Sequence, residues 1–278
     1  MNVLSLFDGM SCGQIALHEL GIKVGRYYAS EINKHAIKQT QLNFPDTIQL
    51  GDVRGVHAKD LPKIDLLIGG SPCQGFSFAG KQLNFHDPRS ALFFEFVRIL
   101  NECREVNPDV KFLLENVRMK RECEQVISDT LGIKPVMINS ALVSAQNRVR
   151  LYWSNVLSEI PQPQDRCLCG YDVIGKECKA KQKAIIVLNK QDGKLPFRPY
   201  RLYDPCGLFP AICSTHQGYD IRINDNGVIR KLAPSEAARL QTIPDWYRWE
   251  CSVTQQYTML GNGWTVEVIK HIFSFLQL

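Results

Sequence analysis

The chain has 278 residues, of which 45% are hydrophobic, and a net charge of +5. This length suits one large domain or a domain with a smaller insert, and the apolar content allows a sizeable buried core. Apolar runs such as 64–68 are too short to span a bilayer, and the start MNVLSLFDGM lacks the features of a secretion signal, so we expect a cytoplasmic protein. The scattered cysteines favour free thiols over a disulfide scaffold.

Five short apolar runs have the length and composition of buried strands: 3–7, 25–29, 47–50, 64–68 and 110–114. Helical spacing of apolar residues predicts helices between them, notably over 34–43 and 89–106. Strands that alternate with helices are typical of a parallel, doubly wound sheet, so the sequence predicts an α/β, Rossmann-like fold. Ligands of such sheets bind beyond the carboxyl ends of the strands, where this sequence places Gly, Asp or Glu.

The predicted alternation of strands and helices ends after Trp153. The segment 155–231 contains six prolines and little periodicity, and it carries twelve basic against eight acidic residues. We interpret it as a loop-rich insert that could face a polyanion, although a solvated surface explains such a small surplus equally well. Regular patterning returns with a helix start at Pro234 and an apolar helix over 265–276. The predicted organisation is therefore 1–154, an insert over 155–231, and a return over 232–278.

The strand ends near the N-terminus suggest an adenosine site. The segment FDGMSCG joins the first strand to the first helix, and its glycines allow a close approach of the backbone to a ligand. Glu31 and Asp52 follow the next two strands, where they could accept from ribose hydroxyls and from an adenine amino group. Solvated strand-end acids are the alternative for each alone. Together, and without phosphate-binding features, they favour S-adenosylmethionine over NAD or ATP.

A second group of residues suggests a nucleophilic site. GGSPCQGFS places Cys73 just past a buried strand, after Pro72, whose ring fixes φ. A nucleophilic cysteine needs a partner that activates its target. Glu115 follows the neighbouring predicted strand, and Arg148 and Arg150 would point to one face of an extended segment. We expect all four at one catalytic site.

These segments occur in the order found in one protein family. They are FDGMSCG, SEIN, GDVR, GGSPCQGFS, ENV, QNRVR, LAPSEAARLQTIP and GNGWTVEVI. The chain resembles the cytosine-C5 DNA methyltransferases over nearly its whole length. Its catalytic segments are most similar to the animal de novo enzymes, whereas QNRVRLYW and the short insert indicate a bacterial or phage member, with a place in restriction-modification, phage protection or regulation.

The resemblance implies a reaction. S-adenosylmethionine would give its methyl group to carbon 5 of a cytosine flipped out of double-stranded DNA, leaving S-adenosylhomocysteine. Cys73 would add to carbon 6, and Glu115, kept protonated by burial, would bind N3 and the N4 amino group. Arg148 and Arg150 would hold O2 and the flanking phosphate. The insert would recognise the DNA target sequence.

Further site residues follow from matching positions and from the insert. The predicted cofactor-binding residues are Phe7, Asp8, Gly9, Met10, Ser11, Cys12, Glu31, Ile32, Asp52, Val53, Gly70, Leu92, Asn262 and Trp264. The predicted DNA-binding residues are Gln74, Ser77, Arg198, Arg201, Thr215 and Gln217.

Two other functions fit the same segments less well. An RNA (tRNA) cytosine-C5 methyltransferase is the first alternative, but that branch carries Pro-Pro-Cys where this chain has Ser71-Pro72-Cys73. A non-catalytic relative is the second, but such proteins lose parts of an active site that is complete here.

Two surface features remain. Cys167, Cys169 and Cys178 lack a clear second ligand pair, so we expect no metal. In the animal relatives the segment LFFEF forms a dimer contact. Because Phe93 and Phe94 are adjacent, one of them should face outward. That ring could join two copies of the chain in a homo-oligomer. The alternative is that all the phenylalanines here belong to the core.

Overall fold

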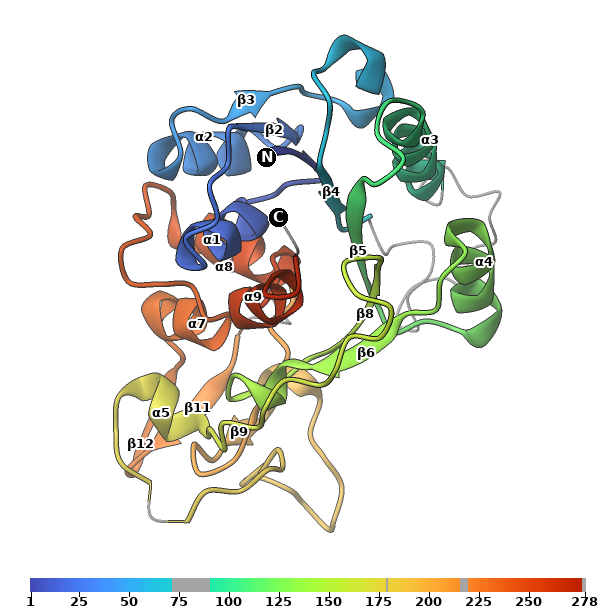
Figure 1. Cartoon of the computed structure of the whole chain (residues 1–278). Coiled ribbons are helices and arrows are strands. Elements are labelled where there is room, and N and C mark those ends of the chain that lie inside the picture. The colour runs from blue at the N-terminus through green and yellow to red at the C-terminus, as the bar shows by residue number, and fades with distance from the viewer. Residues whose placement is uncertain (72–90, 179, 216–219, 277–278) are drawn as a thin grey trace. The chain divides into compact units, whose positions relative to one another are not determined.

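The computed structural model describes residues 1–71, 91–178, 180–215 and 220–276 (Figure 1). Four residues of the predicted site, Cys73, Gln74, Ser77 and Gln217, therefore lie outside the described residues. The chain forms two compact units. The first comprises Met1–Ile138, Val149–Pro161 and Lys270–Leu278, and the second comprises Asn139–Arg148 and Gln162–Ile269.

A seven-stranded sheet is the centre of the first unit. Its order is β3-β2-β1-β4-β5-β8-β6. The strands are β1 (Asn2–Leu6), β2 (Arg26–Ser30), β3 (Ile48–Gln49), β4 (Leu66–Gly69), β5 (Lys111–Val117), β6 (Val136–Asn139) and β8 (Val149–Ser154). The pairs among β1 to β5 are parallel, as predicted, and β8 runs antiparallel to β5. The α/β fold is confirmed.

Helices complete the first unit. They are α1 (Cys12–Glu19), α2 (Lys34–Asn43), α3 (Ala91–Val106), α4 (Arg121–Leu131) and the end of α9 (Val266–Phe273). Asn33 caps α2 by accepting from the backbone N–H of His35 and Ala36, which explains why this helix begins where the sequence predicts. α3 and α4 share one hydrophobic core with β1, β4, β5 and β8. Two short 3₁₀ turns, η1 (Val53–Gly55) and η2 (Ala58–Asp60), connect β3 to β4.

The second unit has shorter elements. They are η4 (Ser140–Leu142), β7 (Gln146–Asn147), α5 (Gly170–Ile174), η5 (Arg198–Tyr200), β9 (Leu202–Tyr203), β10 (Phe209–Pro210), β11 (Arg222–Asp225), β12 (Val228–Lys231), α7 (Pro234–Leu240) and α8 (Val253–Asn262). A buried network joins its parts: Ser140 Oγ lies 2.8 Å from Thr265 Oγ1, and Gln146 Nε2 donates to the Leu240 carbonyl oxygen at 3.1 Å. Such contacts join 232–269 to 139–148, and both belong to one unit with 162–231, whereas the sequence suggested that all of 232–278 returns to the first part.

Among the described residues, no helix combines the length and apolar character that crossing a membrane requires.

Candidate active site

The carboxyl ends of four parallel strands bring most of the predicted cofactor residues to one edge of the sheet. Phe7 to Cys12 follow β1, Glu31 follows β2, Asp52 follows β3 and Gly70 follows β4. The register pairs Gly69 of β4 with Leu114 of β5, so Gly70 and Glu115 come next along two adjacent strands. The predicted convergence at this edge follows from the parallel pairing.

The turn after β1 has an unusual backbone. Phe7, Gly9 and Ser11 all have left-handed φ values, of 58°, 59° and 66°. Residues other than glycine rarely adopt this region, and such strain collects at ligand sites. The neighbouring strand end stabilises the turn, because Gly9 N–H donates to Glu31 Oε2 at 2.8 Å.

The hydrogen bonds observed to the Glu31 carboxylate all come from backbone N–H groups. Its Oε1 accepts from the N–H groups of Ile32 and Asn33, both at 2.8 Å, and its Oε2 accepts from Gly9. A carboxylate has about four lone-pair directions, and three of them are used here, so Oε2 keeps one site for a further hydroxyl donor. Beside it, the Ile32 side chain is 71% exposed. A fixed acid next to an exposed apolar side chain suits a ribose joined to a flat base.

Asp8 carries a buried carboxyl group with one unused oxygen. Its Oδ1 accepts from the Tyr27 hydroxyl at 2.9 Å, whereas Oδ2 is buried without a hydrogen-bond partner. Burial raises the pKa of Asp8 to about 6, against the hydrogen bonds from Ser5, Ser11 and Tyr27, and the charge of Glu31 adds to the rise. A buried acceptor without a donor indicates a site that a ligand's donor would complete.

The other residues of this turn expose backbone groups, rather than side chains, to a possible ligand. Met10, Ser11 and Cys12 are buried, and Ser11 Oγ donates to Gln14 Oε1 at 3.2 Å. A Cβ added to Gly9 would meet no atom within 4 Å, so the backbone borders open space there. The half-buried Phe7 and Leu92 pack against the hydrophobic core.

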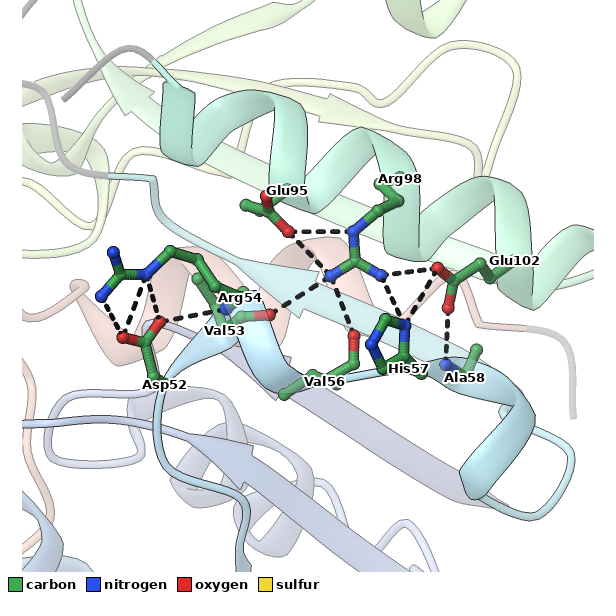
Figure 2. Close-up of polar contacts among 9 residues, drawn as sticks. All are labelled: Asp52, Val53, Arg54, Val56, His57, Ala58, Glu95, Arg98 and Glu102. Carbon is green, nitrogen blue, oxygen red and sulfur yellow. Dashed lines mark hydrogen bonds and ion pairs between the residues drawn. The ribbon is translucent and has the colours of Figure 1, made fainter. Parts of the chain in front are cut away.

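Asp52 begins the turn η1 and pairs with its own neighbour (Figure 2). Its Oδ1 accepts from Arg54 N–H at 3.0 Å, and the Arg54 guanidinium donates to both carboxylate oxygens. These contacts lower the pKa of Asp52 to about 2, so the carboxylate is charged. The next residue, Val53, is buried in the core. The sequence alone did not suggest the role of Arg54.

Glu115 and Arg150 form an ion pair that sequence reasoning did not predict, since it placed both residues at the chemical site but expected a neutral Glu115. Glu115 lies within β5 opposite Tyr152 of β8 and is only 8% exposed. Arg150 lies on β8, and its Nε is 3.0 Å from Glu115 Oε1. The antiparallel pairing of β5 and β8 therefore fixes the direction of this buried carboxylate.

Asn116 links this pair to the segment that leads to Cys73. Its Nδ2 donates to Ser71 Oγ at 3.0 Å and to the Ser71 carbonyl oxygen at 3.4 Å, and both residues are buried. Ser71 is two positions before Cys73. Sequence reasoning noted ENV as a motif but not this tether, because an amide reaching across two strands has no signal in the sequence.

Arg148 differs from Arg150 in its surroundings. It is buried in the second unit, where its guanidinium donates to the carbonyl oxygens of Ile212 (2.8 Å), Gly261 (3.1 Å) and Gly263 (2.8 Å). Gly261 and Gly263 flank Asn262 and precede Trp264, two of the predicted cofactor residues. Arg148 thus fixes the GNGW turn, whereas Arg150 pairs with Glu115, so the two arginines have different partners.

The predicted DNA-binding arginines of the insert also have protein partners. Arg198 donates to the Ala211 carbonyl oxygen, and Arg201 Nε donates to the Pro196 carbonyl oxygen at 2.9 Å. The aromatic residues beside them are more exposed, at 64% for Phe197 and 63% for Tyr200. Sequence reasoning named the two arginines of FRPYR but not these exposed rings. Thr215 is exposed.

The two remaining surface features can be compared with expectation. Phe93 is fully buried and Phe94 is 43% exposed, so one of these adjacent rings does face outward. The Sγ atoms of Cys178 and Cys206 are 3.5 Å apart. Within the described parts of the chain, no group of three or more His, Cys, Asp or Glu residues could hold a metal ion.

The parallel sheet with its antiparallel β8, and the acids at successive strand ends, define an α/β fold of the S-adenosylmethionine-dependent methyltransferase type. The family model described as C-5 cytosine-specific DNA methylase matches residues 1–162 and 176–277. The chain belongs to this family of enzymes, as the sequence motifs predicted.

Two of the curated relatives match almost the whole chain, and a third matches about half of it. The chain is 33% identical to the Type II methyltransferase M1.ScrFI of Lactococcus lactis subsp. cremoris, over 97% of this chain and 76% of that protein. It is 26% identical to the Type II methyltransferase M.HhaI of Haemophilus parahaemolyticus, over 98% of this chain and 93% of that protein. Over 55% of this chain and 37% of that protein it is 36% identical to the orphan methyltransferase M.SPRI of Bacillus phage SPR.

Solved structures share the fold at lower identity. The Entamoeba histolytica methyltransferase EhMeth superposes with a TM-score of 0.76 at 16% identity, over 99% of this chain and 97% of that one. The S. pombe Dnmt2 methyltransferase gives 0.72 at 21% identity, over 99% and 98%. At these identities the likeness concerns the fold, so the preference for DNA over RNA rests on the family and its relatives.

Proposed function

We propose that the protein transfers a methyl group from S-adenosylmethionine to carbon 5 of a cytosine flipped out of duplex DNA, with Cys73 as the nucleophile. The observation that supports this most is the Glu115–Arg150 ion pair on β5 and β8. Asn116, the residue after Glu115, donates to Ser71, which is two positions before Cys73 in the sequence. A buried carboxylate with a fixed direction is what recognition of a pyrimidine edge requires.

The residues after β1 and β2 fit the cofactor. Glu31 would bind the ribose hydroxyls, Ile32 would pack on the adenine ring, and the free Asp8 Oδ2 would accept from the cationic amino acid end. Asp52 and Val53 would bind the adenine edge. When bound, S-adenosylmethionine supplies an electrophilic methyl group on its sulfonium. Asn262 and Trp264 stay proposals from the family motif, held in a turn that Arg148 fixes.

The catalytic residues act on the base. The Cys73 thiolate forms a bond to carbon 6, and the electron pair of the C5–C6 double bond makes carbon 5 nucleophilic. In its protonated form Glu115 donates its proton to N3 and accepts from the N4 amino group, and it takes the proton back from N3 when the cysteine leaves. Arg150 orients Glu115 and reaches O2 of the base. Once carbon 5 is substituted, its proton leaves to a base, the double bond re-forms, and the cysteine departs.

DNA recognition is assigned to the insert and to the segment after Cys73. Gln74 and Ser77 would contact the DNA near the flipped base, and Thr215 and Gln217 would read the target. Because Arg198 and Arg201 have backbone partners, we assign them the support of the exposed Phe197 and Tyr200 rings as well as phosphate contact. Duplex DNA is the substrate, and tRNA is the outcome that the assay must exclude.

One assay tests the nucleophile, the acid and the substrate together. Transfer of tritiated methyl groups is measured on duplex DNA and on tRNA, with the wild type, Cys73→Ser and Glu115→Gln. We expect activity on DNA alone, loss of turnover in Cys73→Ser, and a rate reduced about 10²–10⁴-fold in Glu115→Gln. Cys123→Ser, a partly buried thiol on α4, is the matched control and should retain wild-type activity.

Methylation by Cys73→Ser at the wild-type rate would refute the assigned nucleophile, and a higher rate on tRNA than on DNA would establish the RNA alternative.

The exposed Phe94 also leads us to propose a contact between two copies of the chain. Sedimentation of the wild type as a monomer at micromolar concentration would contradict that contact.

A further inference from the structure

An arginine on α3 lies between two acids of the same helix (Figure 2). Arg98 Nε and Nη2 donate to Glu95 Oε2 at 2.9 and 2.7 Å, and Nη1 donates to Glu102 Oε1 at 2.5 Å. Nη1 also lies 3.3 Å from His57 Nδ1. Spacings of three and four residues place these side chains on one helix face. The two acids hold the guanidinium plane in one orientation, because each occupies a different edge.

This fixed guanidinium also contacts the segment that follows Asp52. Its Nη2 donates to the Val56 carbonyl oxygen at 2.9 Å and to the Val53 carbonyl oxygen at 3.4 Å. Two residues after Val56, the N–H of Ala58 donates to Glu102 Oε2 at 2.7 Å. A single helix face therefore binds the backbone of the turn at both of its ends, and Figure 2 shows these contacts side by side.

The apolar and polar contacts of the turn have different consequences. Val53, Val56 and Ala58 are buried in the hydrophobic core, so the turn keeps its place in the fold without Arg98. Hydrophobic burial has no preferred direction, however, and does not set the orientation of a carbonyl group. Hydrogen bonds to the carbonyl oxygens do set it. They fix the peptide planes that follow Asp52, and with them the adenine edge of the proposed cofactor site.

We propose that Arg98 is a positioning residue for adenine recognition: it holds the backbone of 53–56 so that Asp52 and Val53 meet the base in one geometry. The inference rests on the proposed use of S-adenosylmethionine. Lysine cannot replace this arginine, because one ammonium group cannot span Glu95, Glu102 and two carbonyl oxygens in a fixed plane. Arg98 itself does not touch the cofactor.

The test compares cofactor affinity with turnover. Arg98→Met keeps the aliphatic stem, and Arg98→Lys keeps the charge; Arg104→Met, which removes an arginine packed over Phe112 on the same helix, is the matched control. We expect the Kd for S-adenosylmethionine to rise about tenfold in both Arg98 variants, the loss associated with one or two hydrogen bonds. At saturating cofactor, kcat and the KM for DNA should stay within about twofold of wild type, and Arg104→Met should keep the wild-type Kd.

A double-mutant cycle with Asp52→Asn distinguishes positioning of the Asp52 turn from a general destabilisation of the fold. If Arg98 acts through the Asp52 turn, Arg98→Met should weaken cofactor binding less in the Asp52→Asn background than in wild type. Wild-type cofactor affinity in both Arg98 variants, or fully additive effects in the cycle, would overturn this inference but leave the proposed function standing. A wild-type protein that binds no S-adenosylmethionine would overturn the proposed function and the inference with it.

Discussion

The buried carboxyl of Asp8 makes the stability of the protein depend on pH in a direction that can be measured. Burial raises its pKa from 3.8 to about 6. Between these values the folded protein holds a proton that the unfolded chain releases, so the contribution of Asp8 to stability is largest below pH 3.8 and is lost as the pH rises through 6. The full change corresponds to about 3 kcal/mol.

Asp8→Asn should remove this dependence, because an amide of the same shape carries no charge at any pH. We expect the variant to exceed the wild type in free energy of unfolding by up to about 3 kcal/mol at pH 7.5, with the difference disappearing near pH 4. Urea titrations followed by circular dichroism at both pH values measure the difference. The same variant should bind S-adenosylmethionine more weakly, because the free oxygen Oδ2 no longer offers a negative charge.

Asp52→Asn is the control, because the pKa shift of Asp52 has the opposite sign to that of Asp8. The Arg54 contacts lower the pKa of Asp52 to about 2, so its favourable contribution is present above pH 3.8 and is lost as the pH falls towards 2. Replacing this half-exposed acid should therefore not stabilise the protein at pH 7.5. An equal stability difference between Asp8→Asn and wild type at pH 4 and pH 7.5 would refute the account of Asp8.

Two further predictions concern the second unit. Arg148→Met should lower the free energy of unfolding by about 3 kcal/mol, because three backbone carbonyl oxygens each lose the hydrogen bond from Arg148. Urea titration measures this, and an unchanged midpoint would contradict the structural role. Gly261→Ala should destabilise by about 2 kcal/mol in thermal unfolding, since its Cβ would lie 2.3 Å from the Cys213 backbone, whereas Gly55→Ala has open space and should be neutral. Equal melting temperatures of the two alanine variants would show that the chain relaxes around Gly261.

The parallel strands could be predicted because their information is local. Each is a short apolar run that ends in a turn residue, and α2 occupies 34–43 as predicted because Asn33 supplies its cap. The positions of Glu31 and Asp52 then follow from topology, since parallel strands end at one edge of the sheet. Membership of the family could be predicted from the order of the motifs.

The prediction that Arg148 and Arg150 point to one face shows where local reasoning ends. Alternation along an extended segment places both on one face, but the chain passes from one compact unit to the other between Arg148 and Val149. Only Arg150 lies on β8, where β5 brings Glu115 to it. The tethers made by Asn116 and Arg98 are equally invisible in the sequence, because each depends on two segments that meet only in the folded protein.

The turn after β1 concentrates several unfavourable features in five residues. Two residues other than glycine, Phe7 and Ser11, adopt left-handed backbone, and between them lies a buried acid with a raised pKa and an oxygen without a donor. Each would be removed by simple substitution if stability were the only requirement. A cationic ligand that donates to Asp8 offsets both the buried charge and the missing hydrogen bond. Ligand binding should therefore stabilise the protein more at pH 7.5 than at pH 5, since only ionised Asp8 attracts the cation.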